Sequence, residues 1–194
     1  MSKELNAGNS PSIRCDRKTN MFEQQYRWDE LPQVDGPGVY AYFLTDHSAL
    51  PTIQTDATCP LYVGMTASSL DSRCHFNHSH SGFSTFRRSL GAILKQVLDL
   101  KAQPRSSGQS SSNTQNFRFD EAGEAQLTEW MRDNLRYAHM AVNEDIETVE
   151  ADLIKSLEPS LNLKGWRNPQ KPVIQELRRV CVREARGQTP NALS

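Results

Sequence analysis

Residues 38–45 read GVYAYFLT, and residues 61–65 read LYVGM. Both runs are rich in β-branched and aromatic residues, which are favoured in strands. The first run follows the turn-forming residues 35–37, DGP, and Gly and Pro at its start are typical of a strand boundary. We therefore expect two strands, over 38–45 and 61–65, that pair antiparallel across the intervening loop.

The rest of the chain is predicted to be mainly helical around a third strand at 136–142. Six helices are expected from apolar spacing and from polar residues placed to cap them. They cover about residues 21–28, 69–77, 84–101, 121–134, 146–157 and 172–186. These elements predict an α/β fold, with a small three-stranded antiparallel sheet surrounded by helices and a helical C-terminal extension.

The length of 194 residues fits one domain with short appendages. Residues 1–20 are polar and lack apolar periodicity, which is typical of a mobile leader. Residues 103–116, QPRSSGQSSSNTQN, are rich in Ser, Gln and Asn and predict a flexible loop inside the domain. We expect the domain to span residues 21–163 and a basic helical extension to span residues 164–194.

Charge is distributed unevenly along the chain, although 22 basic and 23 acidic residues give a net charge of −1. Residues 73–118 hold seven Lys or Arg and one acid, and residues 164–186 hold seven Lys or Arg and two acids. Residues 119–160, between them, hold 11 acids and three bases. Two basic zones on either side of an acidic zone could follow a phosphate backbone around a metal site. Ordinary solvated helix faces would produce the same pattern.

The composition argues against a membrane-spanning helix. Mean hydropathy is −0.65, and the longest aliphatic or aromatic run is the six residues 39–44, whereas a spanning helix needs about 20. The first dozen residues contain no apolar segment, so no secretory signal is expected. Cys15, Cys59, Cys74 and Cys181 form no CxxC pair, so we expect free thiols in a reducing compartment. The expected location is the cytoplasm.

The helix expected over residues 146–157 carries a carboxylate on its apolar face. Glu150 points into the middle of the arc formed by the apolar residues Ile146, Val149, Leu153, Ile154 and Leu157. An unpaired buried carboxylate is costly, so a cation, either a metal ion or an arginine, is expected opposite it. A structural salt bridge at the edge of the core is the alternative.

The helix expected after Ser69 brings polar side chains to one face. Arg73 and Asn77 lie four residues apart, and His78 lies beside them. A guanidinium matches phosphate oxygens and keeps its charge at neutral pH, so this face fits phosphate recognition.

The same segment also suggests a zinc site. The candidate ligands are Cys74, His75, His78 and His80, with Cys59 as a distant addition. Their spacing matches no common structural zinc site, so a polar, His-rich helix end is the preferred interpretation.

In their order along the chain, these motifs resemble the signature of the GIY-YIG nuclease superfamily. The matching residues are Gly38-Val39-Tyr40, Leu61-Tyr62-Val63-Gly64, Leu70, Arg73, Glu150 and Asn162. The resemblance covers about residues 38–163. The stretches STFRRSLG, residues 84–91, and LNL, residues 161–163, are similar to a bacterial subgroup of small single-domain members whose chains also end in a basic helix.

The resemblance implies a metal-dependent endonuclease that cleaves DNA phosphodiester bonds with Mg²⁺ or Mn²⁺. It implies Tyr40 and Tyr62 as paired active-site tyrosines and Arg73 as the residue that holds the scissile phosphate. Glu150 would be the metal ligand, which agrees with its place on the apolar face. Asn162 would be a structural or substrate-positioning amide.

One departure from the family pattern affects proton transfer. Many members have a His or Tyr four residues after the arginine, where this chain has Asn77, which cannot accept and release a proton near neutral pH. If that position takes part in proton transfer, His78 or His80 must replace it. The alternative function is therefore a catalytically weak nucleic-acid-binding module with the same fold.

A further set of residues is expected to contact the DNA substrate without reacting with it. These residues are Gly64, Asn77, Arg87, Arg88, Arg178, Arg179 and Arg183.

Overall fold

The computed structural model describes residues 22–50, 52–56, 58–77, 80–105 and 116–188. The expected leader at residues 1–20 lies outside the described residues, as does the middle of the expected loop at 103–116. His78 lies outside them too.

The main sheet has three strands, β1 (Gly38–Leu44), β2 (Tyr62–Thr66) and β5 (Leu135–Ala141). β1 is central and pairs antiparallel with both neighbours, so the order is β2-β1-β5. The register places Tyr40 opposite Gly64 on β2 and opposite His139 on β5. The expected α/β fold with a three-stranded antiparallel sheet is confirmed, and each strand lies within one residue of its predicted bounds.

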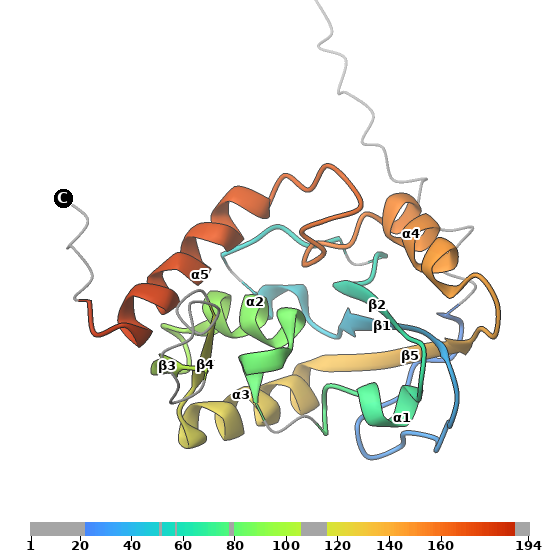
Figure 1. The fold of residues 1–194 in the computed structure, drawn as a ribbon, viewed down its shortest axis with the longest axis horizontal. Helices are drawn as coiled ribbons and strands as arrows, with labels where there is room; N and C mark the ends of the chain where they lie inside the picture. The colour runs from blue at the N-terminus through green and yellow to red at the C-terminus, as the bar shows by residue number, and fades with distance from the viewer. Residues whose placement is uncertain (1–21, 51, 57, 78–79, 106–115, 189–194) are drawn as a thin grey trace, which may run out of the picture.

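Helices cover both faces of this sheet (Figure 1). Val39, Ala41 and Phe43 of β1 face α4 (Ile146–Leu157). Tyr40 and Tyr42 face the opposite way, into a larger core. That core is built by α1 (Leu70–Arg73), α2 (Thr85–Leu94), α3 (Glu121–Asn134) and α5 (Lys171–Ala185). Because alternate side chains of a strand point to opposite faces, β1 is buried on both sides.

The C-terminal helix is part of the fold core. Ile174 and Cys181 of α5 are completely buried in the same cluster as Tyr40. α5 packs against α2 and against β3 (Ala102–Pro104). β3 pairs with β4 (Phe117–Phe119), so the two ends of the loop expected at 103–116 form a small second sheet.

Three helix predictions need correction. The helix expected over 84–101 ends at Leu94, because the chain then turns, with Asp99 at a positive φ of 47°, and leads into β3. Residues 22–28 contain no α-helix, because Tyr26 forms two backbone hydrogen bonds with Tyr137 and extends the sheet. The helix expected over 69–77 ends at Arg73, because Cys74 adopts an extended backbone with φ −63° and ψ 116°. Short 3₁₀ turns at His47–Ala49 and Ser81–Phe83, here η2 and η3, complete the described elements.

The cysteines differ from one another in the structure. Cys74 and Cys181 are free and buried, as expected. Cys59 is disulfide-bonded, so the expectation of a free thiol is wrong for this residue. In the described part of the chain, no helix has both the length and the apolar character needed to span a membrane.

Candidate active site

The phenol of Tyr40 lies directly over Gly64 of the neighbouring strand. A Cβ atom at Gly64 would stand 2.6 Å from the Tyr40 hydroxyl oxygen and 3.0 Å from the Tyr62 ring. Only glycine leaves this space empty, because real Cβ atoms are not found so close to other atoms. Gly64, which was expected to contact substrate, therefore has a steric role: it lets the two tyrosines lie together.

His75 is the hydrogen-bond partner of Tyr40. The Tyr40 hydroxyl oxygen lies 3.1 Å from Nε2 of His75, and Nδ1 of His75 lies 3.1 Å from Oγ of Ser84. The backbone of His75 is also held, because its N–H donates to the Tyr42 hydroxyl at 2.7 Å and its carbonyl accepts from Arg87 at 3.1 Å. His75 is 1% exposed. The ring is thus fixed in place beneath Tyr40.

The cap of α2 lies against the ring of His75. Oγ of Ser84 accepts a hydrogen bond from the backbone N–H of Arg87, as an N-cap residue does. The same Oγ lies 3.1 Å from Nδ1 of His75. In the tautomer with its proton on Nε2, the neutral ring accepts from Ser84 and donates to the oxygen of Tyr40; the other tautomer reverses both bonds.

Arg73 supplies a second favourable interaction to the same oxygen. The pKa of Tyr40 is raised to about 12, mainly by burial, while the charge of Arg73 and its hydrogen bond to the phenol act in the opposite direction. The negative charge of Glu150 contributes to the rise. Arg73 therefore stabilises a phenolate at Tyr40, whereas burial and a nearby carboxylate oppose it.

Glu150 and Tyr62 line one cleft at the edge of β2. The cleft has a volume of about 590 Å³ and continues between the loop after α4 and the N-terminal half of α5. Glu150 is half-buried, and its pKa is raised first by burial and second by Glu147. Among the described residues it has no hydrogen-bond or ion-pair partner. Burial also raises the pKa of Tyr62, and the charge of Glu150 adds to this effect.

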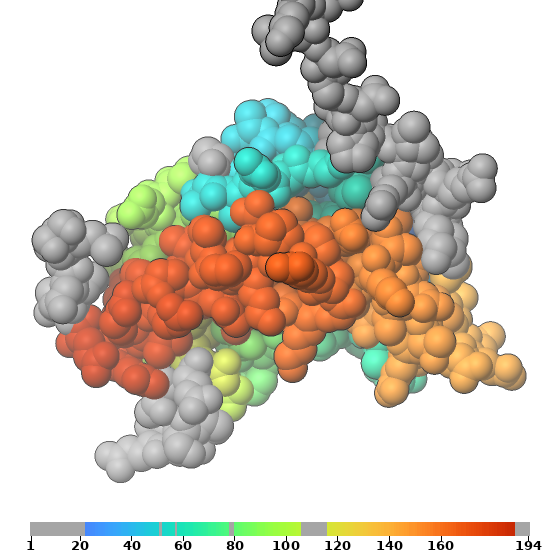
Figure 2. Space-filling view, turned by 90° about the horizontal axis from the view of Figure 1, so that it is seen from above, coloured from blue at the N-terminus to red at the C-terminus, as the bar shows by residue number. Residues whose placement is uncertain are grey.

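Basic side chains form the other end of this cleft. They are Lys164, Lys171 and Arg178. In the space-filling view, α4, the following loop and α5 lie one after another, from right to left, across one face of the molecule (Figure 2). Arg179 and Arg183, also expected to contact DNA, are ion-paired with Glu176 on the exposed side of α5 and do not line the cleft.

Asn162 has a structural arrangement. Its side-chain oxygen accepts from the N–H of Val63 at 2.9 Å, and its side-chain nitrogen donates to the carbonyl of Val63 at 2.8 Å. The oxygen and the nitrogen of this side-chain amide thus hold the loop after α4 against the free edge of β2. Of the two roles implied for Asn162, this geometry supports the structural one.

Arg87 also has structural partners. It is completely buried and forms an ion pair of 2.9 Å with Glu124. It also donates to the carbonyl of His75, so it holds the segment that carries the histidine. No part of its side chain reaches solvent, which removes it from the residues able to contact a substrate.

Asn77 and His80 lie away from Tyr40. Because α1 ends at Arg73, Asn77 is exposed and does not share a helix face with the arginine. Both residues line a separate cavity of about 960 Å³, together with Trp28 and residues of α3. His80 accepts a hydrogen bond from the N–H of Gly82 and caps the turn η3.

The residues of the cleft fit a magnesium or manganese ion better than zinc. Mg²⁺ is commonly bound through one or two carboxylates while water and substrate phosphates complete its coordination. Glu150 offers such a carboxylate, half-buried, without a protein cation, in a cleft with room for phosphate. Among the described residues, no three His, Cys, Asp or Glu side chains are grouped as a metal site.

Two features of the site were missed from the sequence. The sequence presents His75 only as a candidate zinc ligand, because a helix that continued to residue 77 would place Asn77 beside Arg73. Lys164 and Lys171 lie in the basic zone 164–186, whose charge was the available signal.

Comparison with known proteins agrees with this geometry. The family model described as the GIY-YIG catalytic domain matches residues 38–184, from the start of β1 almost to the end of α5. The comparisons with curated proteins and with solved structures gave no match. The family match covers most of the chain and includes the tyrosines, Arg73 and Glu150, so the protein belongs to the GIY-YIG family of nuclease domains.

Proposed function

We propose that this protein is a metal-dependent endonuclease that hydrolyses phosphodiester bonds of DNA. The observation that carries the proposal is the cleft lined by Glu150 and Tyr62, because Glu150 has no ion-pair partner among the described residues. Lys164, Lys171 and Arg178 line the same cleft. A phosphate in this cleft would meet the positive charge of these basic residues, and the carboxylate of Glu150 would hold a metal ion beside it.

The side chains around Tyr40 suggest how the phenol takes part. With its proton on Nε2, His75 would donate to the oxygen of Tyr40, and Arg73 interacts with the same oxygen. Both interactions are stronger with a phenolate than with a phenol, so they lower the cost of deprotonating Tyr40. We propose that Tyr40 is the proton-accepting group in its deprotonated form, and that His75 holds it in place.

Arg73 has a second part in the proposed reaction. Phosphodiester hydrolysis increases the negative charge on the oxygens around phosphorus, and a guanidinium at a preset position stabilises that charge. Glu150 would hold the Mg²⁺ or Mn²⁺ ion, which when bound supplies further positive charge to the phosphate oxygens. The negative charge of Glu150 raises the pKa of Tyr40, so neutralising this carboxylate favours the Tyr40 phenolate.

One observation favours the alternative, a nucleic-acid-binding module with weak or no catalysis. Burial raises the pKa of Tyr40 to about 12, so without a further cation nearly all of the phenol stays protonated at neutral pH. A protein of this kind would bind DNA through Lys164, Lys171 and Arg178 and leave it intact.

Incubation with supercoiled plasmid and with branched DNA separates the two functions. The reactions contain Mg²⁺, Mn²⁺ or a chelator, and nicked and linear products are resolved on a gel. We expect cleavage with either metal and none with chelator, and we expect Glu150→Gln to abolish it. Asp152→Asn is the matched control, because Asp152 is an exposed acid on the same helix that does not line the cleft.

The binding-module function would be supported by wild-type protein that binds DNA but cleaves none with either metal. Cleavage by a folded Glu150→Gln variant at the wild-type rate would rule out the proposed role of this carboxylate.

A further inference from the structure

Arg88 carries a buried charge that has no acidic partner. Its side chain lies on α2 and is 8% exposed. Its guanidinium donates to the carbonyl of Gly82 at 2.6 Å and to the hydroxyl of Thr85 at 3.3 Å. Its Nε is buried without a hydrogen-bond partner. Neutral groups therefore orient the guanidinium of Arg88 but leave its charge uncompensated.

Two further arginines lie around the same turn, η3. The side chain of Arg105 packs on Gly82, where an added Cβ would stand 2.8 Å from Cγ of Arg105. The guanidinium of Arg105 lies 4.7 Å from the ring centre of Phe83, which is 68% exposed. The Nε of Arg105, like that of Arg88, is buried without a hydrogen-bond partner.

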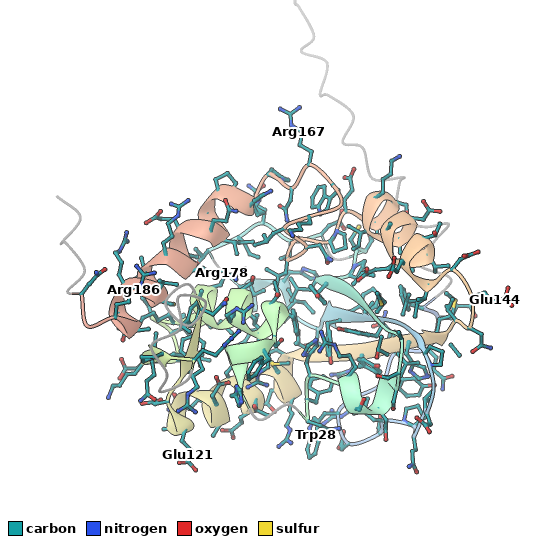
Figure 3. The ribbon with its side chains drawn as sticks, viewed as in Figure 1. Trp28, Glu121, Glu144, Arg167, Arg178 and Arg186 are labelled. Carbon is teal, nitrogen blue, oxygen red and sulfur yellow. The ribbon has the colours of Figure 1, made fainter. Side chains whose placement is uncertain are left out.

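Arg178 joins this group from α5, which packs against α2. It lines the cleft of Glu150 together with Thr85, the residue whose hydroxyl accepts from Arg88. The group of three arginines is thus continuous with the proposed active site. Figure 3 labels Arg178 beneath α5, on the side of α2.

No carboxylate of the described residues forms an ion pair with any of these three arginines. The ion pairs among the described residues involve other basic side chains. Residues 106–115, which follow Arg105, contain no Asp or Glu. Burial, and after it the charges of Arg178 and Arg105, lower the pKa of Arg88 to about 10. Gathering like charges in a partly buried place is unfavourable unless an anion joins them.

We propose that Arg88, Arg105 and Arg178 form a second phosphate subsite, which binds the DNA backbone at a phosphate other than the one cleaved. The proposal rests on the proposed function, because it takes the adjoining cleft as the place of cleavage. Arginine forks suit a phosphate in two ways, since they present paired N–H donors and keep their charge. Arg105 and Arg178 would contact the phosphate. Arg88 would hold η3 in place and add positive potential from its buried position.

The test measures DNA binding without metal, so that no cleavage is needed. A fluorescent duplex of about 20 base pairs is titrated with wild-type protein, Arg105→Gln and Arg178→Gln over a range of salt concentrations. Each lost phosphate contact should flatten the plot of log affinity against log salt by about one unit. We expect each variant to bind about tenfold more weakly at 0.1 M salt, with the flatter slope.

Arg167→Gln is the matched control. Arg167 is exposed and extends away from the protein (Figure 3), and it does not line the cleft. Its replacement removes the same charge and should leave the salt slope at the wild-type value. Arg88 is not replaced, because its bond to Gly82 also holds η3. Thermal melts of each variant establish that it is folded.

The proposal is overturned if folded Arg105→Gln and Arg178→Gln bind the duplex with the wild-type affinity and slope. Inorganic phosphate is the second probe. If phosphate raises the melting temperature of the wild type but not of Arg178→Gln, while both bind DNA equally, the site takes free anions and the DNA assignment is wrong. A protein whose DNA binding depends on these arginines but which cleaves nothing would refute the proposed nuclease and leave the subsite intact.

Discussion

Replacing Gly64 by alanine tests the placement of Tyr40 without removing any polar group. The new Cβ would stand 2.6 Å from the Tyr40 oxygen, whereas ordinary contact begins at 3.4 Å. The phenol must therefore move by about 0.8 Å, away from β2. A displacement of about 1 Å at a reacting group can lower a rate about 10²-fold.

The same substitution should cost stability as well. Overfilling a packed site usually lowers the free energy of unfolding by about 1–3 kcal/mol, and domains are typically stable by about 5–15 kcal/mol. Most of the Gly64→Ala protein should therefore remain folded at 25 °C. The loss of rate then reports on the position of Tyr40 and not on unfolding.

The assay compares the rate of plasmid nicking under single-turnover conditions with DNA affinity measured in chelator. We expect Gly64→Ala to nick about 10²-fold more slowly and to bind DNA as the wild type does. Gly91→Ala is the control, because its Cβ would overlap Phe119 in the core of the α2 side, away from the cleft. It should lose comparable stability and keep the nicking rate of its folded fraction. Nicking by folded Gly64→Ala at the wild-type rate would refute the role of Tyr40.

Three other predictions follow from burial and partners. Burial raises the pKa of Glu150 above its value in the unfolded chain, so the native state binds the Glu150 proton more tightly than the unfolded state does. The stability that this proton provides is lost as pH rises through the folded-state pKa. In chelator, Glu150→Gln should therefore melt at a higher temperature than wild type at pH 8, and thermal melts should show that advantage shrinking toward pH 4. Glu124→Gln leaves the buried charge of Arg87 without its ion pair and should lower the free energy of unfolding by about 3–5 kcal/mol; a urea titration that shows less than 1 kcal/mol would contradict this. Asn77→His should leave the nicking rate unchanged, because Asn77 is exposed and lines a different cavity from that of Glu150; a faster variant would return Asn77 to the active site.

The strands and the helix of Glu150 were predictable because their signals are local. Their β-branched and aromatic content, with the flanking Gly and Pro, predicts strands over 38–45 and 61–65, and the observed register places Tyr40 opposite Gly64. The apolar arc of α4 likewise places Glu150 on its buried side, whatever the helix packs against.

The interior of the site depended on where α1 stops. A serine cap predicts a helix start, but no local signal marked its end after one turn. That end decides the site, because it turns His75 inward under Tyr40 and leaves Asn77 in solvent. Contacts distant in sequence, from Tyr42 and Arg87 to the backbone of His75, stabilise this turn.

The sequence by itself therefore determined the sheet, the family resemblance and the candidates Tyr40, Tyr62, Arg73 and Glu150. It also located positive charge in residues 164–186. The amount of charge on a helix does not tell which of its side chains face a cleft and which face solvent. Only the packing of α5 on α2 decided that Arg178 faces the cleft while Arg179 and Arg183 pair with Glu176 outside it. The physical reason is that strand and helix patterns depend on neighbours in sequence, whereas the face that a charged side chain presents depends on which element packs beside it.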